Sequence, residues 1–113
     1  MVNDFNLGKM PPQDQEIERV VLGSILFDKE IQDEVIGIVK PEYFYKDQNR
    51  AIYESIYKLS NNNSPIDIIT LTAELRRVGD LEMVGGAMYI VELTNGIWTT
   101  DNVIKYCKML RFF

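Results

Sequence analysis

The chain has 113 residues, of which 46% are hydrophobic and 26% are charged, and its net charge is -5. These proportions fit one globular domain with a hydrophobic core and argue against intrinsic disorder. The acidic balance argues against a domain whose main task is to neutralise phosphate groups, although it leaves room for a local basic patch. Since the sequence has no histidine, metal sites and acid–base mechanisms that depend on imidazole are excluded.

The single cysteine and the N-terminal residues indicate the compartment. Cys107 has no possible disulfide partner within the chain, which is typical of a reducing cytoplasm. Residues 1–8 lack the basic and apolar stretches of a signal peptide. The longest uncharged stretch near the N-terminus, residues 20–27, is far shorter than the ~18 residues that cross a membrane. A soluble, cytoplasmic protein is expected, with Cys107 as a buried free thiol.

Residues 1–12 are expected to form a flexible N-terminal lead-in. A first helix is predicted to begin near Asp14, a residue type that caps helix N-termini. Its apolar face has helical spacing and comprises Ile17, Val20, Val21, Ser24 and Ile25. The Gly23-Ser24 pair places small side chains in the middle of this helix, which would let a neighbouring helix approach closely.

The next segment predicts a second helix, a short turn and a third helix. Asp28 is expected to cap the second helix, which must end before Pro41. The aromatic residues 43–45 are expected in the core and at its rim, rather than as a base-stacking platform, because few cations lie between them. A third helix is predicted from about Asp47 to Ser60. Its buried line comprises Ile52, Ile56 and Leu59.

A fourth helix is predicted with Asp67 or Thr70 as its cap and Gly79 at its end. Residues 66–69 also fit a short strand, but the helix is preferred because no second strand is available. The turn at residues 84–86 is expected to start a fifth helix rather than to bind phosphate. Leu71, Leu75 and Val78 are predicted to face inward from the fourth helix, and the apolar residues of the fifth helix are Met88, Ile90, Val91 and Leu93.

A sixth helix is predicted from about residue 100, with apolar and basic residues mixed on one side. Those residues are Ile104, Lys105, Lys108, Arg111 and Phe112. Because the pattern is still running at Phe113, we expect the helix to be truncated there and to continue in a longer protein. Trp98 is expected to anchor the preceding loop to the core, with contact to a partner as the alternative. The predicted fold is all-α, a compact orthogonal bundle of about six helices.

Catalytic sites were sought among the glycines and the carboxylates. No G-x-x-x-x-G-K-[ST] or G-x-G-x-x-G segment occurs, so no known phosphate-binding loop is predicted. The 17 acidic residues are interpreted as a solvated surface, because working acid–base pairs sit in clefts that shift their pKa. An unrecognised hydrolase that uses such a pair stays a minor alternative. No catalytic, cofactor or metal residue is therefore predicted in this chain.

Six groups of residues, in order and at matching spacing, resemble one family, the N-terminal domain of DnaB-type replicative DNA helicases. The groups are Gln15-Glu16 with residues 20–26 and Asp28; Lys40-Pro41-Glu42 with Phe44-Tyr45; Arg50 with residues 52–56; residues 65–71 with Glu74-Leu75; Val84-Gly85-Gly86; and Tyr89. The resemblance runs from about Pro11 to the mid-100s. Residues 96–100, Gly-Ile-Trp-Thr-Thr, depart from the family's usual small-residue loop, which leaves the local geometry there open.

The resemblance implies a non-catalytic interaction and oligomerisation domain of an ATP-dependent replicative helicase. The ATPase site, with its ATP and Mg²⁺, would lie in a separate C-terminal domain that this chain lacks. Residues 13–99 would form the helical domain, and residues 100–113 would begin a helical hairpin that pairs subunits. Copies of the chain would pair within a hexameric ring and form its collar. Primase, and in some species a helicase loader, would dock on this collar during DNA replication.

Ile104, Lys105, Lys108, Arg111 and Phe112 are the residues that we expect at the subunit or partner interface. For the two apolar residues the alternative is packing on further residues of the same chain. For the three cations the alternatives are a solvated face, which is preferred, and contact with nucleic acid or an acidic partner. Little direct DNA binding and no membrane contact are expected. A stand-alone helical nucleic-acid-binding domain is the alternative function.

Overall fold

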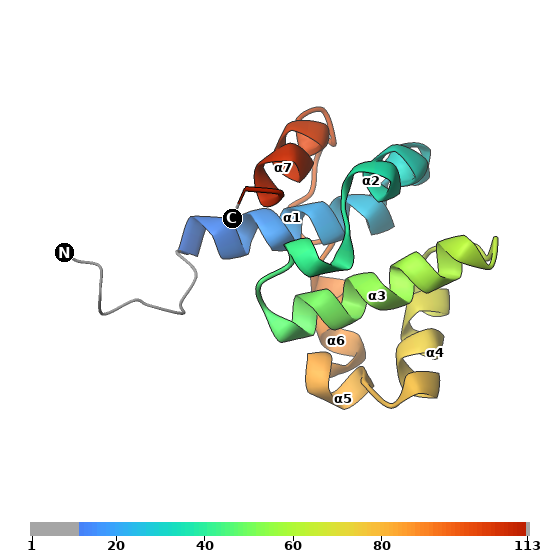
Figure 1. The fold of residues 1–113 in the computed structure, drawn as a ribbon. Helices are drawn as coiled ribbons and strands as arrows, with labels where there is room; N and C mark the ends of the chain where they lie inside the picture. Colours follow the sequence, from blue (N-terminus) through green and yellow to red (C-terminus); the bar gives the residue numbers. More distant parts are fainter. Residues whose placement is uncertain (1–11, 113) are drawn as a thin grey trace.

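The computed structural model describes residues 12–112, and every regular element in that range is helical (Figure 1). The elements are α1 (Pro12–Phe27), η2 (Lys29–Ile31), α2 (Gln32–Ile38), η3 (Pro41–Tyr43), α3 (Asp47–Asn61), α4 (Ile68–Val78), α5 (Leu81–Val84), α6 (Gly86–Glu92) and α7 (Val103–Leu110), where η marks a 3-10 helix. The all-α prediction is confirmed. The described residues contain one α-helix more than predicted, because the short helix α5 precedes the glycine turn.

Helix α1 begins at Pro12, two residues before the predicted start. Proline is favoured in the first turn of a helix, where its missing N–H has no helical acceptor. Apart from Pro12, the predicted flexible lead-in lies outside the described residues.

Helix α1 runs through the middle of the fold, with α7 on one side and α3 on the other (Figure 1). Helix α7 also packs against α2, and α3 also packs against α4 and α5. The fully buried side chains of α1, α3, α4, α6 and α7 meet in one core. Its largest apolar members include Leu22, Ile25, Ile52, Tyr53, Ile56, Leu71, Leu75, Ile90 and Leu110.

Helix α1 meets the end of α6 at Gly23. A Cβ atom on Gly23 would lie 2.0 Å from the carbonyl oxygen of Leu93, so only a glycine fits here. The neighbouring Ser24 is also buried, on the face that the sequence assigned to it. The predicted close approach at the small pair in α1 is confirmed, and α6 is the helix that approaches.

Two acidic residues fix the starts of later helices. The Asp67 carboxylate accepts a hydrogen bond from the Thr70 N–H at 2.8 Å, and the Thr70 hydroxyl accepts one from the Asp67 N–H at 3.0 Å. Both predicted caps of α4 are therefore used, in one reciprocal arrangement. The Asp28 carboxylate accepts from the Glu30 N–H at 2.9 Å. Asp28 thus caps η2, and α2 begins only at Gln32, which corrects the prediction that Asp28 caps α2 directly.

Val78, which was predicted to face inward, is exposed, and so are Met88 and Val91, two of the apolar residues of the predicted fifth helix. In α6, Ile90 and Leu93 form the buried line and Met88 and Val91 the opposite line. Both pairs have a spacing of three, so helical periodicity alone cannot choose between them in a helix of seven residues.

Candidate protein-interaction surface

Helix α7 is held by an apolar inner face. Val103, Cys107 and Leu110 are buried, and the helix packs against α1 and α2. Burial raises the pKa of the Cys107 thiol to about 12, and the negative charge of Glu34 adds to this effect. A thiol that stays protonated is a poor nucleophile. Cys107 is therefore a packing residue, as the sequence predicted.

The outer face of α7 and the residues after it carry most of the predicted interface set. Lys105, Lys108 and Arg111 are exposed, and Phe112 is 80% exposed. The guanidinium carbon of Arg111 lies 5.7 Å from the centroid of the Phe112 ring, within cation–π range. Ile104 differs from the other four, because it is partly buried against the core. The structure therefore brings three cations and one aromatic ring together on an open surface.

The loop between α6 and α7 contradicts one prediction. Trp98 does not anchor this loop to the core, because it is 87% exposed. Ile97, the residue before it, is partly buried, and its side chain lies 3.3 Å from the position that a Gly23 Cβ would take. Ile97 therefore anchors this loop to α1, the role that the sequence analysis assigned to Trp98. The indole is left as the most exposed of the large hydrophobic side chains in the described residues.

The loop has hydrogen bonds on both sides of Trp98. The Ile97 N–H donates to the Thr94 carbonyl at 3.2 Å. The Thr100 hydroxyl donates to the Asp28 carboxylate at 2.7 Å, across 72 positions of sequence. Asp28, which also caps η2, therefore ties the start of α7 to the end of α1.

A hollow of about 270 Å³ lies beside Trp98, between α1, the loop and the start of α7. Its lining is largely apolar and includes Val20, Ser24, Ile97, Trp98, Val103 and Tyr106. The hydroxyl of Ser24 is buried with no hydrogen-bond partner among the described residues. Nothing in the sequence predicted this hollow, since its walls come from segments far apart in the chain.

A buried carboxylate joins three helices on the other side of α1. Glu18 is fully buried, and it accepts hydrogen bonds from the Tyr45 N–H at 2.6 Å and from the Asn49 side-chain amide at 2.8 Å. The Tyr89 hydroxyl in turn donates to the Asn49 side-chain oxygen at 3.0 Å. The interpretation of the acidic residues as a solvated surface is therefore wrong for Glu18. Burial also raises the pKa of the Tyr89 hydroxyl, which keeps it a donor.

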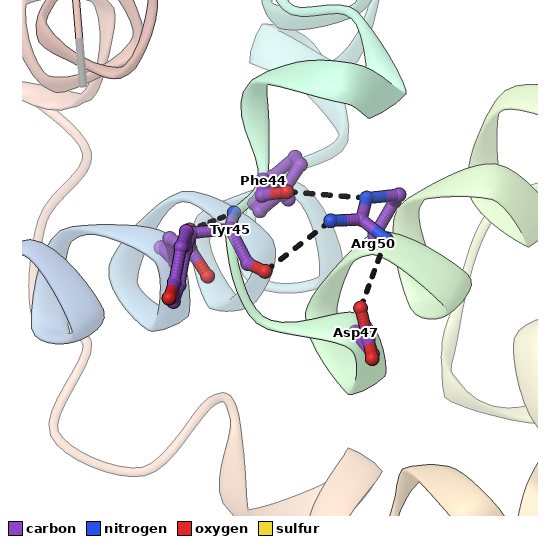
Figure 2. Close-up of polar contacts among 5 residues, drawn as sticks. Phe44, Tyr45, Asp47 and Arg50 are labelled. Atoms are coloured by element: carbon purple, nitrogen blue, oxygen red, sulfur yellow. Dashed lines mark hydrogen bonds and ion pairs between the residues drawn. The ribbon is translucent and has the colours of Figure 1, made fainter. Parts of the chain in front are cut away.

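Arg50 fixes the connection between η3 and α3 (Figure 2). Its guanidinium donates to the Phe44 and Tyr45 carbonyls, both at 3.2 Å, and to the Asp47 carboxylate at 3.0 Å. Phe44 is buried and Tyr45 is half exposed, so these aromatic residues lie in the core and at its rim, as predicted. An open hollow of about 610 Å³ lies beside Tyr45, and Met83 is also among its lining residues. Arg50 also lines this hollow, together with Lys46, while its guanidinium makes these three hydrogen bonds.

The polar side chains that form hydrogen bonds between the elements hold the fold together. Within residues 12–112, no cluster of three or more Cys, Asp or Glu could hold a metal ion. The glycine turn before α6 is a packing turn, since a Cβ on Gly85 would lie 2.9 Å from the Tyr89 Cβ. A hydrogen bond from Arg77 lowers the pKa of Glu74, the reverse of what a general acid needs. No helix in the same range is long and apolar enough to cross a bilayer.

Comparison with known proteins shows which family this chain is similar to. Residues 10–112 match the family of DnaB-like helicase N terminal domains. Over 103 residues the chain is 36% identical to the replicative DNA helicase DnaB of Rhodothermus marinus, covering 91% of this chain and 11% of that protein. Over 102 residues it is 36% identical to the DnaB of Haemophilus influenzae, covering 90% of this chain and 22% of that protein.

A solved structure gives the same result. The crystal structure of the N-terminal domain of DnaB helicase from Mycobacterium tuberculosis superposes with a TM-score of 0.81 at 34% identity, covering 89% of this chain and 72% of that one. The chain thus spans only a small part of the helicases that it matches. It belongs to the family of DnaB-like helicase N-terminal domains.

Proposed function

We propose that this domain is the non-catalytic assembly domain of a replicative DNA helicase, and that its copies pair through α7 to form part of a ring collar. The observation that carries the proposal is the outer face of α7 together with the two residues after it, where Lys105, Lys108, Arg111 and Phe112 lie open to solvent. An exposed ring flanked by cations on a helix with a buried inner face is typical of an interface. Ile104, at the edge of this face, would pack against the partner with its remaining exposed surface. The division into a helical domain (13–99) and a pairing segment (100–113) stays part of this proposal.

The helicase activity would reside outside this chain. We assign ATP and Mg²⁺ to another part of the protein, because the engaged carboxylates and the glycine turn here serve packing and no known phosphate-binding loop occurs in the sequence. Primase, and in some species a helicase loader, would dock on the collar. The reduced, buried Cys107 is consistent with the cytoplasm, where replication proceeds.

Sedimentation of the purified chain at several concentrations tests this proposal. We expect weak, concentration-dependent association, because each copy has a net charge of -5 and charges of one sign repel. A tight, monodisperse hexamer of this fragment would contradict the proposal, as would a strict monomer at millimolar concentration. ATP hydrolysis by the fragment alone would contradict the non-catalytic assignment.

The second candidate function is nucleic-acid binding, favoured by the three exposed cations of α7. Titration of labelled single- and double-stranded DNA at two salt concentrations separates the two functions. Micromolar or tighter affinity with a steep dependence on salt would favour the nucleic-acid interface, because phosphate contacts release counterions. No measurable binding would leave the three cations to a protein partner.

A further inference from the structure

Asn95 and Gly96 form the corner of a turn between the end of α6 and the loop that leads into α7. The Ile97 N–H donates to the Thr94 carbonyl at 3.2 Å, which closes the turn around these two residues. Gly96 has a φ of +83°, a conformation that glycine adopts without strain. Both residues are exposed, and a Cβ atom on Gly96 would meet nothing within 4 Å. The peptide bond between Asn95 and Gly96 therefore lies in open space.

The backbone N–H of Gly96 distinguishes Asn95 from the other asparagines. This N–H donates no hydrogen bond to any described residue, and the Asn95 side-chain amide forms none with them either. At each of the other asparagines between residues 12 and 112, the N–H of the following residue donates to a backbone carbonyl. These donors are Arg50, Asn62, Asn63, Ser64 and Val103, at distances from 2.9 to 3.2 Å. Within the described residues, Asn95 is thus the one asparagine that precedes an unbonded backbone nitrogen.

An asparagine that precedes glycine can react with its own main chain, and Asn95-Gly96 is the only such pair in the sequence. The Gly96 nitrogen gives up its proton and bonds to the Asn95 side-chain carbonyl carbon, while the side-chain nitrogen leaves with that proton as ammonia. The product is a cyclic imide. Water opens it either at the side-chain carbonyl, which gives aspartate, or at the main-chain carbonyl, which gives isoaspartate. Glycine favours the ring closure because it has no Cβ to obstruct the attack, and water is the only co-reactant.

We propose that Asn95-Gly96 is a site of spontaneous deamidation, and that its isoaspartate product loosens the loop that leads into α7. Isoaspartate routes the main chain through the former side chain, so it adds a methylene group to the backbone of the turn. Ile97 follows directly and lies against Gly23 of α1, where the fit is close. A longer turn displaces Ile97 from this fitted position. The modification needs no partner and does not depend on the proposed assembly function.

Peptide mapping by mass spectrometry tests the reaction after long incubation of the chain in mildly alkaline buffer, once folded and once in urea. Asn63 is the internal control. It is exposed and precedes a small residue, but the Ser64 N–H donates to the Leu59 carbonyl at 2.9 Å. In the folded chain we expect loss of the amide at Asn95 and retention at Asn63. In urea, where the control bond is broken, both should react.

Two variants separate the new charge from the change in the main chain. Deamidation places a carboxylate beside Arg19 and Glu16, which line the same small hollow as Asn95. Freshly purified Asn95→Asp carries this charge on an unaltered main chain. Asn95→Gln keeps an amide, but its longer side chain must close a larger, less favoured ring, so it should stay intact on incubation. The deamidated chain, isolated by ion exchange, should unfold at a lower urea concentration than either variant.

The outcomes test the two parts of the inference one by one. Loss of the Asn95 amide in the folded chain, with isoaspartate detected by an isoaspartyl methyltransferase, supports the site. Loss confined to urea, or equal loss at Asn63 in the folded chain, overturns it. If the deamidated chain and Asn95→Asp unfold at the same urea concentration, the loosening of the loop is overturned. None of these results depends on self-association, so the sedimentation test of α7 stands or fails separately.

Discussion

Gly23 in α1 and Leu93 at the end of α6 meet backbone to backbone. A Cβ atom on Gly23 would lie 2.0 Å from the Leu93 carbonyl oxygen. Because the loop that carries Trp98 begins directly after Leu93, this contact also sets the point from which the loop leaves the core. The same loop then leads into α7. One glycine in the first helix therefore sets the start of the loop that leads into α7.

Gly23→Ala should destabilise the domain by about 1–3 kcal/mol or more, because the new methyl group must displace backbone rather than a side chain. Gly37→Ala is the matched control. Gly37 is exposed in α2, and a Cβ there would meet nothing within 4 Å, so alanine should stabilise the helix by about 0.5–1 kcal/mol. Urea unfolding of both variants measures the difference. Equal stabilities for the two variants would contradict the close approach of α1 and α6.

Glu18→Gln should destabilise the domain by about 1–3 kcal/mol. The carboxylate accepts from both Tyr45 and Asn49, whereas a glutamine would turn an amide donor toward one of these donors. Glu16→Gln, two residues away on the exposed side of α1, should change the free energy of unfolding by less than about 0.5 kcal/mol. The account of the buried network fails if both substitutions are equally mild in thermal or chemical unfolding.

Asp28 and Thr100 should show energetic coupling in a double-mutant cycle. Asp28→Ala removes both the cap of η2 and the acceptor for the Thr100 hydroxyl, whereas Thr100→Val removes only the second bond. The cap alone contributes about 1 kcal/mol, so Asp28→Ala should be the more damaging change. A coupling of about 0.5 kcal/mol or more is expected. Strict additivity in chemical unfolding would show that the tether across the loop does not form.

Cys107 should resist thiol reagents in the folded state. With its pKa raised by burial from 9.0 to about 12, the thiolate at pH 8 is on the order of 1,000-fold scarcer than for an ordinary thiol. The free energy of unfolding should also fall as the pH rises from about 9 toward 12, because the unfolded chain releases this proton first. Cys107→Ala should lack that part of the pH dependence. Rapid labelling of native protein at pH 8 would contradict the buried site.

The sequence predicted the helical class because its apolar residues recur at helical spacing and its caps and breakers are chemically explicit. Asp67, Thr70 and Gly79 all act where their residue types predicted. The small pair at Gly23 correctly indicated a close approach. Its partner was not predictable, because spacing within one helix carries no information about which other helix reaches it.

Glu18 and Trp98 show where sequence reasoning failed. Glu18 precedes Leu22 and Ile25 by four and seven positions, so it lies on the buried face of α1. That position was the available signal, but the carboxylate looked like a surface residue because its partners come from α3 and the connection before it. For Trp98 no such signal exists. Ile97 and Trp98 are adjacent and both apolar, and only the geometry of the loop decides which of them turns inward.

The central claim is that the outer face of α7 joins proteins together, and sedimentation of two matched variants tests it most directly. Phe112→Asp and Ile69→Asp place the same charge at side chains that are 80% and 79% exposed, one after α7 and the other on α4. We predict that Phe112→Asp weakens self-association by about tenfold or more, while Ile69→Asp sediments like the unaltered chain. Unchanged association of Phe112→Asp, or an equal loss in both variants, would contradict the claim.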